Sequence, residues 1–283
     1  MPVRLFPLYA VLLGLPILAG GPAPAGAVET AWVDGYNSKT RMIGGRLAGT
    51  NGSLRIVAGI EIKLASGWKT YWRAPGDSGG VPPSFAWTGS RNLASATVLY
   101  PAPRRLKDVL GYAVGYADSV VFPVLVAPHD ENKPVELKLA LEYGICREIC
   151  VPAEAKVVLV IPVGSVSLPD ALRAALDRVP REPAQRRPQD PAFKSGKAVL
   201  AGDKPHLVVE AEFGGGTAGA DAYIEAPGSI YLSLPKPVRA DGTSRIVFEV
   251  DLSGVEVKDL RGKVLRVTLV SNAGSSEAYW KID

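Results

Sequence analysis

The chain has 283 residues, 47% of them hydrophobic, and its 32 lysines and arginines nearly balance 28 aspartates and glutamates, leaving a formal net charge of +4. This length suits one large domain or two ordinary ones, and the apolar content is ample for their cores. Because the positive excess is small and scattered, we expect no nucleic acid as a partner. Two cysteines are too few for a disulfide scaffold, so the pair needs a local explanation.

The N-terminus has the three-part pattern of a secretory signal peptide. Arg4 precedes an apolar run, which gives way to small residues ending at Ala27. An uncleaved membrane anchor is the alternative, but Pro7 and Pro16 interrupt the run, which falls short of the roughly 18 to 20 residues that span a bilayer. We therefore expect residues 1–27 to be cleaved and the mature chain to be soluble and exported.

Residues 28–165 show the period-two alternation of β-strands. The clearest run begins at Leu54, where Ile56, Ile60 and Ile62 alternate with mostly polar or small residues. Further runs are SATVLYPA, SVVFPVLVA, VELKLALEY and AKVVLVIPV, separated by clusters of Gly, Pro, Asn and Asp. Short alternating strands at roughly ten-residue spacing predict an antiparallel β-sandwich.

A helix and a proline-rich linker are expected over residues 166–191. Ser167 can cap the helix, Pro169 lies in its first turn and Pro180 ends it. The prolines that follow predict an extended, semi-rigid connector in which the basic stretch REPAQRR is solvated. We place a domain boundary near residue 190. The apolar face of the helix consists of Leu168, Leu172, Ala175, Leu176 and Val179.

Residues 192–283 return to the strand pattern. Alternation recurs in HLVVEAEF, DAYIEA, SIYLSLP, SRIVFEVDL, KVLRVTLVSN and EAYWKID. We therefore predict a second, smaller β-sandwich-like domain behind the first.

Cys146 and Cys150 lie in the segment EYGICREICVPAEA, shortly before Pro152. In an extended strand these two residues would be about 13 Å apart, well beyond the roughly 7 Å limit for Cα atoms joined by a disulfide. A bond therefore requires the chain to turn, or to form one helical turn, between them. Such a bridge would stabilise the fold by only about 2 kcal/mol, because the loop that it closes is short. The residues alone leave a structural staple and a redox pair equally open.

Metal binding is a third interpretation of the pair. A closed zinc site needs four ligands, and the two histidines, His129 and His206, fall in different predicted domains. Two cysteines alone would suit a soft ion such as Cu(I). The sequence lacks a G-x-S-x-G or H-E-x-x-H motif and a phosphate-binding loop, and we expect no cofactor.

Several segments resemble a known family. The stretches YPAPRRLKDVLGYAVGYADSVVFPVLVAP and VELKLALEYGICREICVPAEAKVVLV are similar to the periplasmic N-terminal domain of the thiol-disulfide interchange protein DsbD and of the related ScsB proteins. GWKTYWRAPGDSGGVPPSFAWTGSRN resembles the matching upstream segment of the ScsB branch. The resemblance covers about residues 50–162 well and the second domain more weakly.

The resemblance implies an immunoglobulin-like domain over residues 28–165, in the periplasm, whose cysteine pair cycles between dithiol and disulfide. In the family the second cysteine of the pair forms the mixed disulfide with a partner. This role falls on Cys150, which leaves Cys146 to resolve the mixed disulfide.

A cap loop over the pair is a further implication of the resemblance. By position it is KDVLGY, in which Asp108 matches the family's acidic residue while Leu110 and Tyr112 supply the cover. Arg147, next to Cys146, would favour a thiolate electrostatically, or is simply solvated. Four aromatic residues either line a docking surface or belong to the sandwich core; they are Trp68, Tyr71, Trp72 and Trp87.

The sequence departs from the family in two details. Three residues separate the cysteines where DsbD has five, and the cap lacks the family's phenylalanine. The sequence also contains neither the membrane-spanning electron carrier nor the thioredoxin-like domain of DsbD and ScsB. We therefore expect a membrane carrier of the DsbD, ScsB or CcdA type, or a thioredoxin-like protein, to supply electrons in trans.

Together these features predict a periplasmic thiol-disulfide oxidoreductase that passes electrons to the disulfides of exported proteins through Cys146 and Cys150. The alternatives are a non-catalytic binding or adaptor module with a structural disulfide, and a Cu(I)-handling protein.

Overall fold

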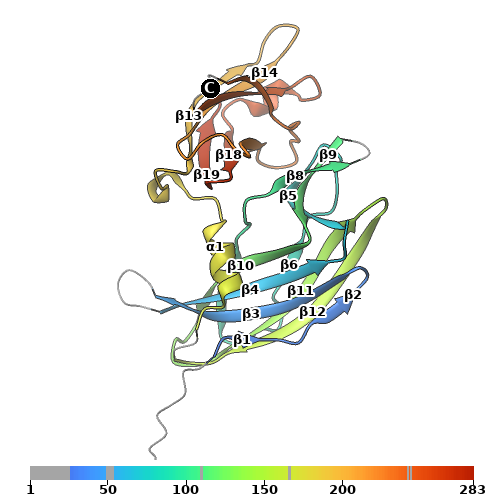
Figure 1. Cartoon of the computed structure of the whole chain (residues 1–283), viewed down its shortest axis with the longest axis vertical. Coiled ribbons are helices and arrows are strands. Elements are labelled where there is room, and N and C mark those ends of the chain that lie inside the picture. Colours follow the sequence, from blue (N-terminus) through green and yellow to red (C-terminus); the bar gives the residue numbers. More distant parts are fainter. Residues whose placement is uncertain (1–25, 49–53, 109–110, 165–166, 241, 243) are drawn as a thin grey trace, which may run out of the picture.

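The computed structural model describes residues 26–48, 54–108, 111–164, 167–240, 242 and 244–283. Most of these residues lie in antiparallel β-strands, and α1 (Asp170–Asp177) is the one α-helix among them (Figure 1). The predicted all-β fold class is confirmed. The predicted signal peptide lies almost entirely outside the described residues. None of the helices in the described part of the chain has the length and apolarity to cross a membrane.

Two six-stranded antiparallel sheets form the N-terminal unit. The strands of the first sheet are Val28–Glu29 (β1), Val33–Gly35 (β2), Ser38–Ala48 (β3), Leu54–Leu64 (β4), Leu93–Val98 (β7) and Ser119–Pro128 (β10). Their order is β1-β3-β4-β10-β7, and β2 pairs with β3. The strands of the second sheet are Lys69–Gly76 (β5), Ser84–Ala86 (β6), Arg104–Asp108 (β8), Gly111–Ala117 (β9), Val135–Cys146 (β11) and Cys150–Ile161 (β12). Their order is β12-β11-β5-β9-β8, and β6 pairs with β11.

The two sheets enclose one core because apolar residues alternate along their strands. In β11, Val135, Leu137, Leu139 and Leu141 are at most 3% exposed, while the residues between them are more open to solvent. The strands β4 and β10 present Ile60, Phe122 and their neighbours to the same core from the other sheet.

The alternation pattern did not predict β3, whose interior contains two glycines. A side chain at Gly45 would lie 2.5 Å from the carbonyl oxygen of Ser167, so glycine allows the segment before α1 to approach the sheet closely. The helix then packs on the outer face of the first sheet, where Leu172 belongs to one buried cluster with Ile43 and Val57.

The start of α1 differs from the prediction. Pro169 is the N-cap residue and no side chain caps the helix, so the expected cap by Ser167 is wrong. Leu168 and Leu172 are buried as expected, and Leu176 packs against the same cluster.

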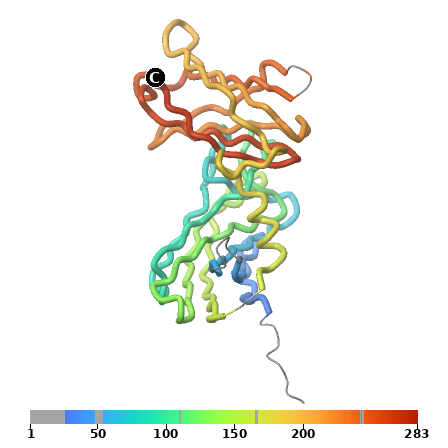
Figure 2. The backbone as a smooth tube through the Cα atoms, turned by 90° about the vertical axis from the view of Figure 1, so that its left-hand side faces the viewer, coloured from blue at the N-terminus to red at the C-terminus, as the bar shows by residue number. Residues whose placement is uncertain are grey.

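Ion pairs hold the connector that follows α1. Arg181 and Arg187 lie 2.7 and 3.2 Å from the carboxylate of Asp177. Arg187 also lies 3.3 Å from Asp190, whose side chain is fully buried. The connector, which includes the 3-10 turn Pro183–Gln185 (η1), is yellow in Figure 2 and runs from the first unit to the second. Arg181 and Arg187 are therefore paired, where the sequence suggested a solvated stretch, and Arg186 is exposed.

The C-terminal unit is a smaller pair of antiparallel sheets. One sheet contains Pro191–Val199 (β13), His206–Phe213 (β14), Lys236–Ala240 (β16) and Arg245–Asp251 (β17), in the order β13-β14-β17-β16. The other contains Asp221–Glu225 (β15), Val264–Ser271 (β18) and Gly274–Lys281 (β19), in that order, and a 3-10 turn, Val257–Leu260 (η2), precedes β18. The segment SIYLSLP, which was expected to be a strand, is irregular, although its Leu232 and Leu234 are buried.

The two units stack end to end along the long axis of the molecule (Figure 1 and Figure 2). At their interface, the ring of Trp72 lies 5.4 Å from that of Tyr223, centroid to centroid. Next to it, Arg73 pairs with Glu225 at 2.7 Å and with Glu277 at 2.5 Å. The strand β5 therefore belongs both to the first sandwich and to the contact with the second unit.

Candidate functional site

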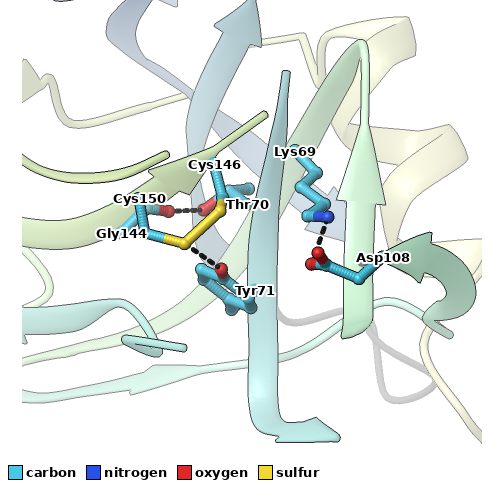
Figure 3. The surroundings of a disulfide bond; sticks show 7 residues. All are labelled: Lys69, Thr70, Tyr71, Asp108, Gly144, Cys146 and Cys150. Carbon is cyan, nitrogen blue, oxygen red and sulfur yellow. Dashed lines mark hydrogen bonds and ion pairs between the residues drawn. A yellow bond between two sulfur atoms is a disulfide. The ribbon is translucent and has the colours of Figure 1, made fainter. Parts of the chain in front are cut away.

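The two cysteines form a disulfide at the tip of the β11–β12 hairpin (Figure 3). Cys146 ends β11, Cys150 begins β12, and the two are directly opposed in the antiparallel ladder with their Cα atoms 4.1 Å apart. The three residues between them form a tight turn in which the N–H of Arg147 donates to the carbonyl oxygen of Ile149 at 3.2 Å. Of the two geometries considered for this segment, the chain adopts the turn and not a helical one.

The two sulfur-bearing residues differ sharply in exposure. Cys146 is 3% exposed, whereas Cys150 is open to solvent. Ile149, beside Cys150 in the turn, is 63% exposed. The Cys150 end of the disulfide is therefore the more accessible to an attacking thiolate.

The disulfide lies on the face of its sheet that points away from the main core. Along β11, Tyr143 and Ile145 enter the core between the sheets, so Cys146 points to the opposite side. There it forms a small separate buried cluster with Tyr71 of β5 and Ala113 of β9. The bond is thus packed from beneath by apolar atoms and open at the Cys150 end.

Tyr71 places a hydroxyl group against the exposed sulfur. Its oxygen lies 3.2 Å from Sγ of Cys150, and because a disulfide sulfur carries no hydrogen, Tyr71 is the donor. Burial of Tyr71 raises the pKa of its hydroxyl, and the nearby negative charge of Asp108 raises it further. The group therefore remains protonated and able to donate at neutral pH. Gly80 permits this placement, because a Cβ there would lie 2.2 Å from the Tyr71 ring, and its φ of +141° suits glycine.

A buried ion pair lies beside the disulfide. Lys69 of β5 is the ladder partner of Cys146, and only 7% of the residue is exposed. Its ammonium nitrogen lies 2.5 Å from Oδ2 of Asp108, at the end of β8 (Figure 3). Next along β5, the hydroxyl of Thr70 donates to the carbonyl oxygen of Gly144 at 2.8 Å, which fixes β5 against the end of β11.

Two of the three predicted cap residues, Asp108 and Tyr112, lie among the described residues. Asp108 is near the disulfide through its contact with Lys69 and its effect on Tyr71. Tyr112 lies on β9 with 45% of its surface exposed. Leu110 is outside the described residues. Cover of the disulfide by a cap loop remains a prediction.

Of the two interpretations of the aromatic set, the docking surface is wrong for three members. Trp68, Tyr71 and Trp72 are at most 6% exposed and belong to buried clusters. Trp87 is partly buried and packs against the core. The sandwich-core interpretation therefore holds for Trp68, Trp72 and Trp87, whereas Tyr71 is buried outside that core, against the disulfide.

Of the two interpretations of Arg147, a charge that favours a thiolate or a solvated side chain, the structure favours the solvated side chain. Its guanidinium lies 5.9 Å from the ring of Trp68 and 4.0 Å from Glu148, and its side chain is 54% exposed. Because solvent screens such a charge, its effect on the sulfurs is small.

The residue that the sequence analysis overlooked is Lys69. The signal was present: a lysine stands in the run GWKTYW, where Lys69, Thr70, Tyr71 and Trp72 are all buried. Lysine is almost never buried without a partner, so its presence among aromatic residues in a strand indicates a paired charge. The partner, Asp108, is distant in sequence and had been considered only as part of a cap.

Among the described residues, no three His, Cys, Asp or Glu side chains are grouped so that they could hold a metal ion. The hydroxyl of Tyr71 contacts Sγ of Cys150, and Lys69, which is paired with Asp108, is the ladder partner of Cys146. The arrangement is suited to thiol chemistry, because it combines one accessible sulfur, one shielded sulfur and a buried cation.

Comparisons with known proteins bear on the family and the fold. Residues 54–162 match the family model described as the N-terminal part of the thiol:disulfide interchange protein DsbD. The chain is also similar in structure to the N-terminal periplasmic domain of ScsB from Proteus mirabilis, with a TM-score of 0.67 and 20% sequence identity over 90% of this chain and 98% of that one. A comparison with curated protein sequences found no match. At this identity the structural likeness shows the fold, which extends over both units.

Proposed function

We propose, on the premise that residues 54–162 form a DsbD N-terminal-like domain, that this protein is a periplasmic thiol-disulfide interchange protein. Its redox domain would span residues 28–165 and be joined through residues 166–191 to a second β domain, residues 192–283. Residues 1–27 would direct the chain to the periplasm and be removed.

The observation that carries the proposal is the difference between the two sulfurs. Cys150 is exposed and Cys146 is 3% exposed, and they share one bond at a hairpin tip. A purely structural bridge gains nothing from one accessible sulfur. The bridge also closes a loop so short that it contributes only about 2 kcal/mol to stability.

Exchange begins when a thiolate of the electron donor attacks Sγ of Cys150. The Cys146–Cys150 bond breaks, its electron pair leaves on Sγ of Cys146, and a mixed disulfide joins the donor to Cys150. A second thiolate of the donor then attacks its own sulfur in this mixed disulfide and releases Cys150 as a thiolate. The donor is oxidised to a disulfide, and this protein gains two electrons as a dithiol.

The same steps in reverse order reduce a target. The Cys150 thiolate attacks the target disulfide and releases one target thiolate, and Cys146 then attacks Cys150 to free the other. The donor would be a membrane carrier of the DsbD, ScsB or CcdA type, or a thioredoxin-like protein, and the targets would be exported proteins. Ile149, exposed next to Cys150, offers an apolar contact to either partner.

Trapping of partners tests the proposal. In cells that export the full chain, Cys146→Ala should accumulate covalent complexes through Cys150 that dithiothreitol releases, because the resolving sulfur is gone. Cys150→Ala, which leaves only the shielded Cys146, is the matched control and should accumulate far fewer. Equal yields from both variants, or none from either, would contradict the assignment.

The reduction potential separates exchange from a structural bridge. We expect a value above about −300 mV, within reach of thioredoxin-like donors. A potential below this value, measured against a thiol buffer on the purified protein, would assign the bridge to structure.

A further inference from the structure

Lys69 is a buried cation whose position the fold of the first sandwich fixes relative to the disulfide. It is the ladder partner of Cys146, so the two side chains lie on the same face of the sheet, and Cβ atoms of such pairs are about 4.5 to 5.5 Å apart. The side chain of Lys69 is 9% exposed and that of Asp108 is 16% exposed. In the disulfide form the two charges balance each other.

Breaking the disulfide changes this balance. The electron pair that leaves the bond is deposited on Cys146, the buried sulfur, and a thiolate in a poorly solvated site is costly unless a cation or hydrogen-bond donor is close. Tyr71 contacts the other sulfur, that of Cys150. Among the described residues, the cation placed directly across the ladder from Cys146 is Lys69.

We propose that Lys69 is a positioning residue for thiol-disulfide exchange: Asp108 holds its ammonium group while the disulfide is intact, and the ammonium stabilises the Cys146 thiolate once the bond breaks. This inference rests on the proposed function and deepens it. The four-carbon side chain of lysine allows the ammonium to move between the two anions without a change in the backbone. No proton or electron moves to or from Lys69 in the step.

Other charged groups around the pair are less suited to this role. Arg147 is more than half exposed and paired with Glu148, so solvent screens both. Asp77, in the loop after β5, accepts a hydrogen bond from the hydroxyl of Tyr231 in the second unit. Asp108 is the group that opposes a thiolate, and it competes with the thiolate for Lys69. The titratable and charged groups around the pair are thus Lys69, Tyr71, Asp108, Arg147 and Glu148, while Asp77 is bound to the second unit.

Thiol titration of the reduced, full-length mature protein tests the inference. We expect Lys69→Met to raise the pKa of the Cys146 thiol by at least about one unit, the lower end of the effect of an opposite charge within 4 to 6 Å. Asp108→Asn should lower that pKa below the wild-type value, because the carboxylate no longer competes for the ammonium. Lys69→Arg should restore a value near that of the wild type. The readout is the carbon chemical shift of labelled cysteine as a function of pH.

The redox equilibrium supplies a second readout. At a pH well above the pKa of Cys146 in both proteins, a rise of about one pKa unit in Lys69→Met should disfavour reduction about tenfold, which corresponds to a potential about 30 mV more negative. Lys156→Met, at an exposed lysine on the same hairpin, is the control and should change neither quantity.

Lys69→Met leaves Asp108 without its cation, and this alone can impair folding. The double variant Lys69→Met/Asp108→Asn avoids this problem, and it is compared with Asp108→Asn alone. We expect the pKa of the Cys146 thiol to be higher in the double variant than in Asp108→Asn alone. An unchanged pKa, or the same direction of change for Lys69→Met and Asp108→Asn, would overturn the inference. Neither result depends on partner trapping, so the inference and the proposed function can fail separately.

Discussion

Tyr71 is the side chain that contacts the exposed sulfur, and its contribution can be measured alone. In the Cys146→Ala background, Cys150 is the single thiol, and its thiolate would accept the hydrogen bond that Tyr71 now donates to the disulfide at 3.2 Å. Hydrogen bonds to charged groups contribute about 1.5 to 3 kcal/mol, so Tyr71→Phe should raise the pKa of the Cys150 thiol by about 1 to 2 units. The rate of alkylation as a function of pH reports this pKa.

The matched control is Tyr279→Phe in the same background. Tyr279 is 52% exposed and lies on β19 of the second unit, with its hydroxyl 3.4 Å from Glu277. It should leave the alkylation profile unchanged. If Tyr71→Phe also leaves the profile unchanged, the hydroxyl does not act on the thiolate.

At the scale of elements, the hairpin β11–β12 holds the cysteines in register without help from their bond. The ladder runs without interruption from Val135 opposite Ile161 to Cys146 opposite Cys150. Replacing both cysteines by serine should therefore lower the free energy of unfolding by only about 2 kcal/mol, the entropic contribution of a short closed loop. Urea unfolding of the variant measures this value.

Leu141→Ala, in the core of the same strand, is the comparison. It should cost about 2 to 5 kcal/mol, because it opens a cavity at a residue that is 1% exposed. A serine variant that loses more than the core variant would show that the bond is a structural staple.

The sequence predicted those strands whose residue pattern is determined mainly by one face being buried in the core. Period-two alternation predicted β4, β10 and β11, since each buries one face in the sandwich core. It did not predict β3, because Gly45 is there to make room for Ser167, a contact that only the folded chain reveals. It wrongly predicted a strand in SIYLSLP, where Leu232 packs into the core of the second unit and Leu234 packs into the core cluster of the first, without a ladder partner.

The candidate site, like the fold, was predictable only in part. The spacing of Cys146 and Cys150 required a turn between them, and the resemblance to DsbD and ScsB indicated exchange chemistry. The pairing of Lys69 with Asp108 was not predictable, because it depends on β5 lying between β11 and β9 in the sheet. The buried position of Tyr71 depends on the same strand order.

At the scale of the whole molecule, β5 connects the disulfide with the second unit. Tyr71 contacts the disulfide, Lys69 is the ladder partner of Cys146, and Trp72 and Arg73 contact the second unit a residue or two further on. A second ion pair, Arg105 with Asp221 at 2.6 Å, supports the same interface from β8. The orientation of the two units therefore depends on a few arginines in the first sandwich and carboxylates in the second.

Removal of the Arg73 side chain should loosen this interface. Glu225 and Glu277 both pair with Arg73, and their side chains are 19% and 13% exposed. Arg73→Met leaves the two carboxylates facing each other in a poorly solvated site, which we expect to cost about 2 to 3 kcal/mol, somewhat less than breaking a fully buried pair. Small-angle scattering should detect a larger radius of gyration, and limited proteolysis should cut the connector faster.

Two further variants identify the cause of this change. Arg73→Met/Glu225→Gln removes one of the opposed charges and should recover part of the lost stability, because the remaining carboxylate still lies near Arg266, at 3.5 Å from Glu277. Lys258→Met removes an exposed pair with Glu256 and should change stability by no more than about 0.5 kcal/mol. If Arg73→Met alone leaves the scattering and the cleavage rate unchanged, apolar contacts such as Trp72 with Tyr223 hold the units together, and the ion pairs only adjust their angle.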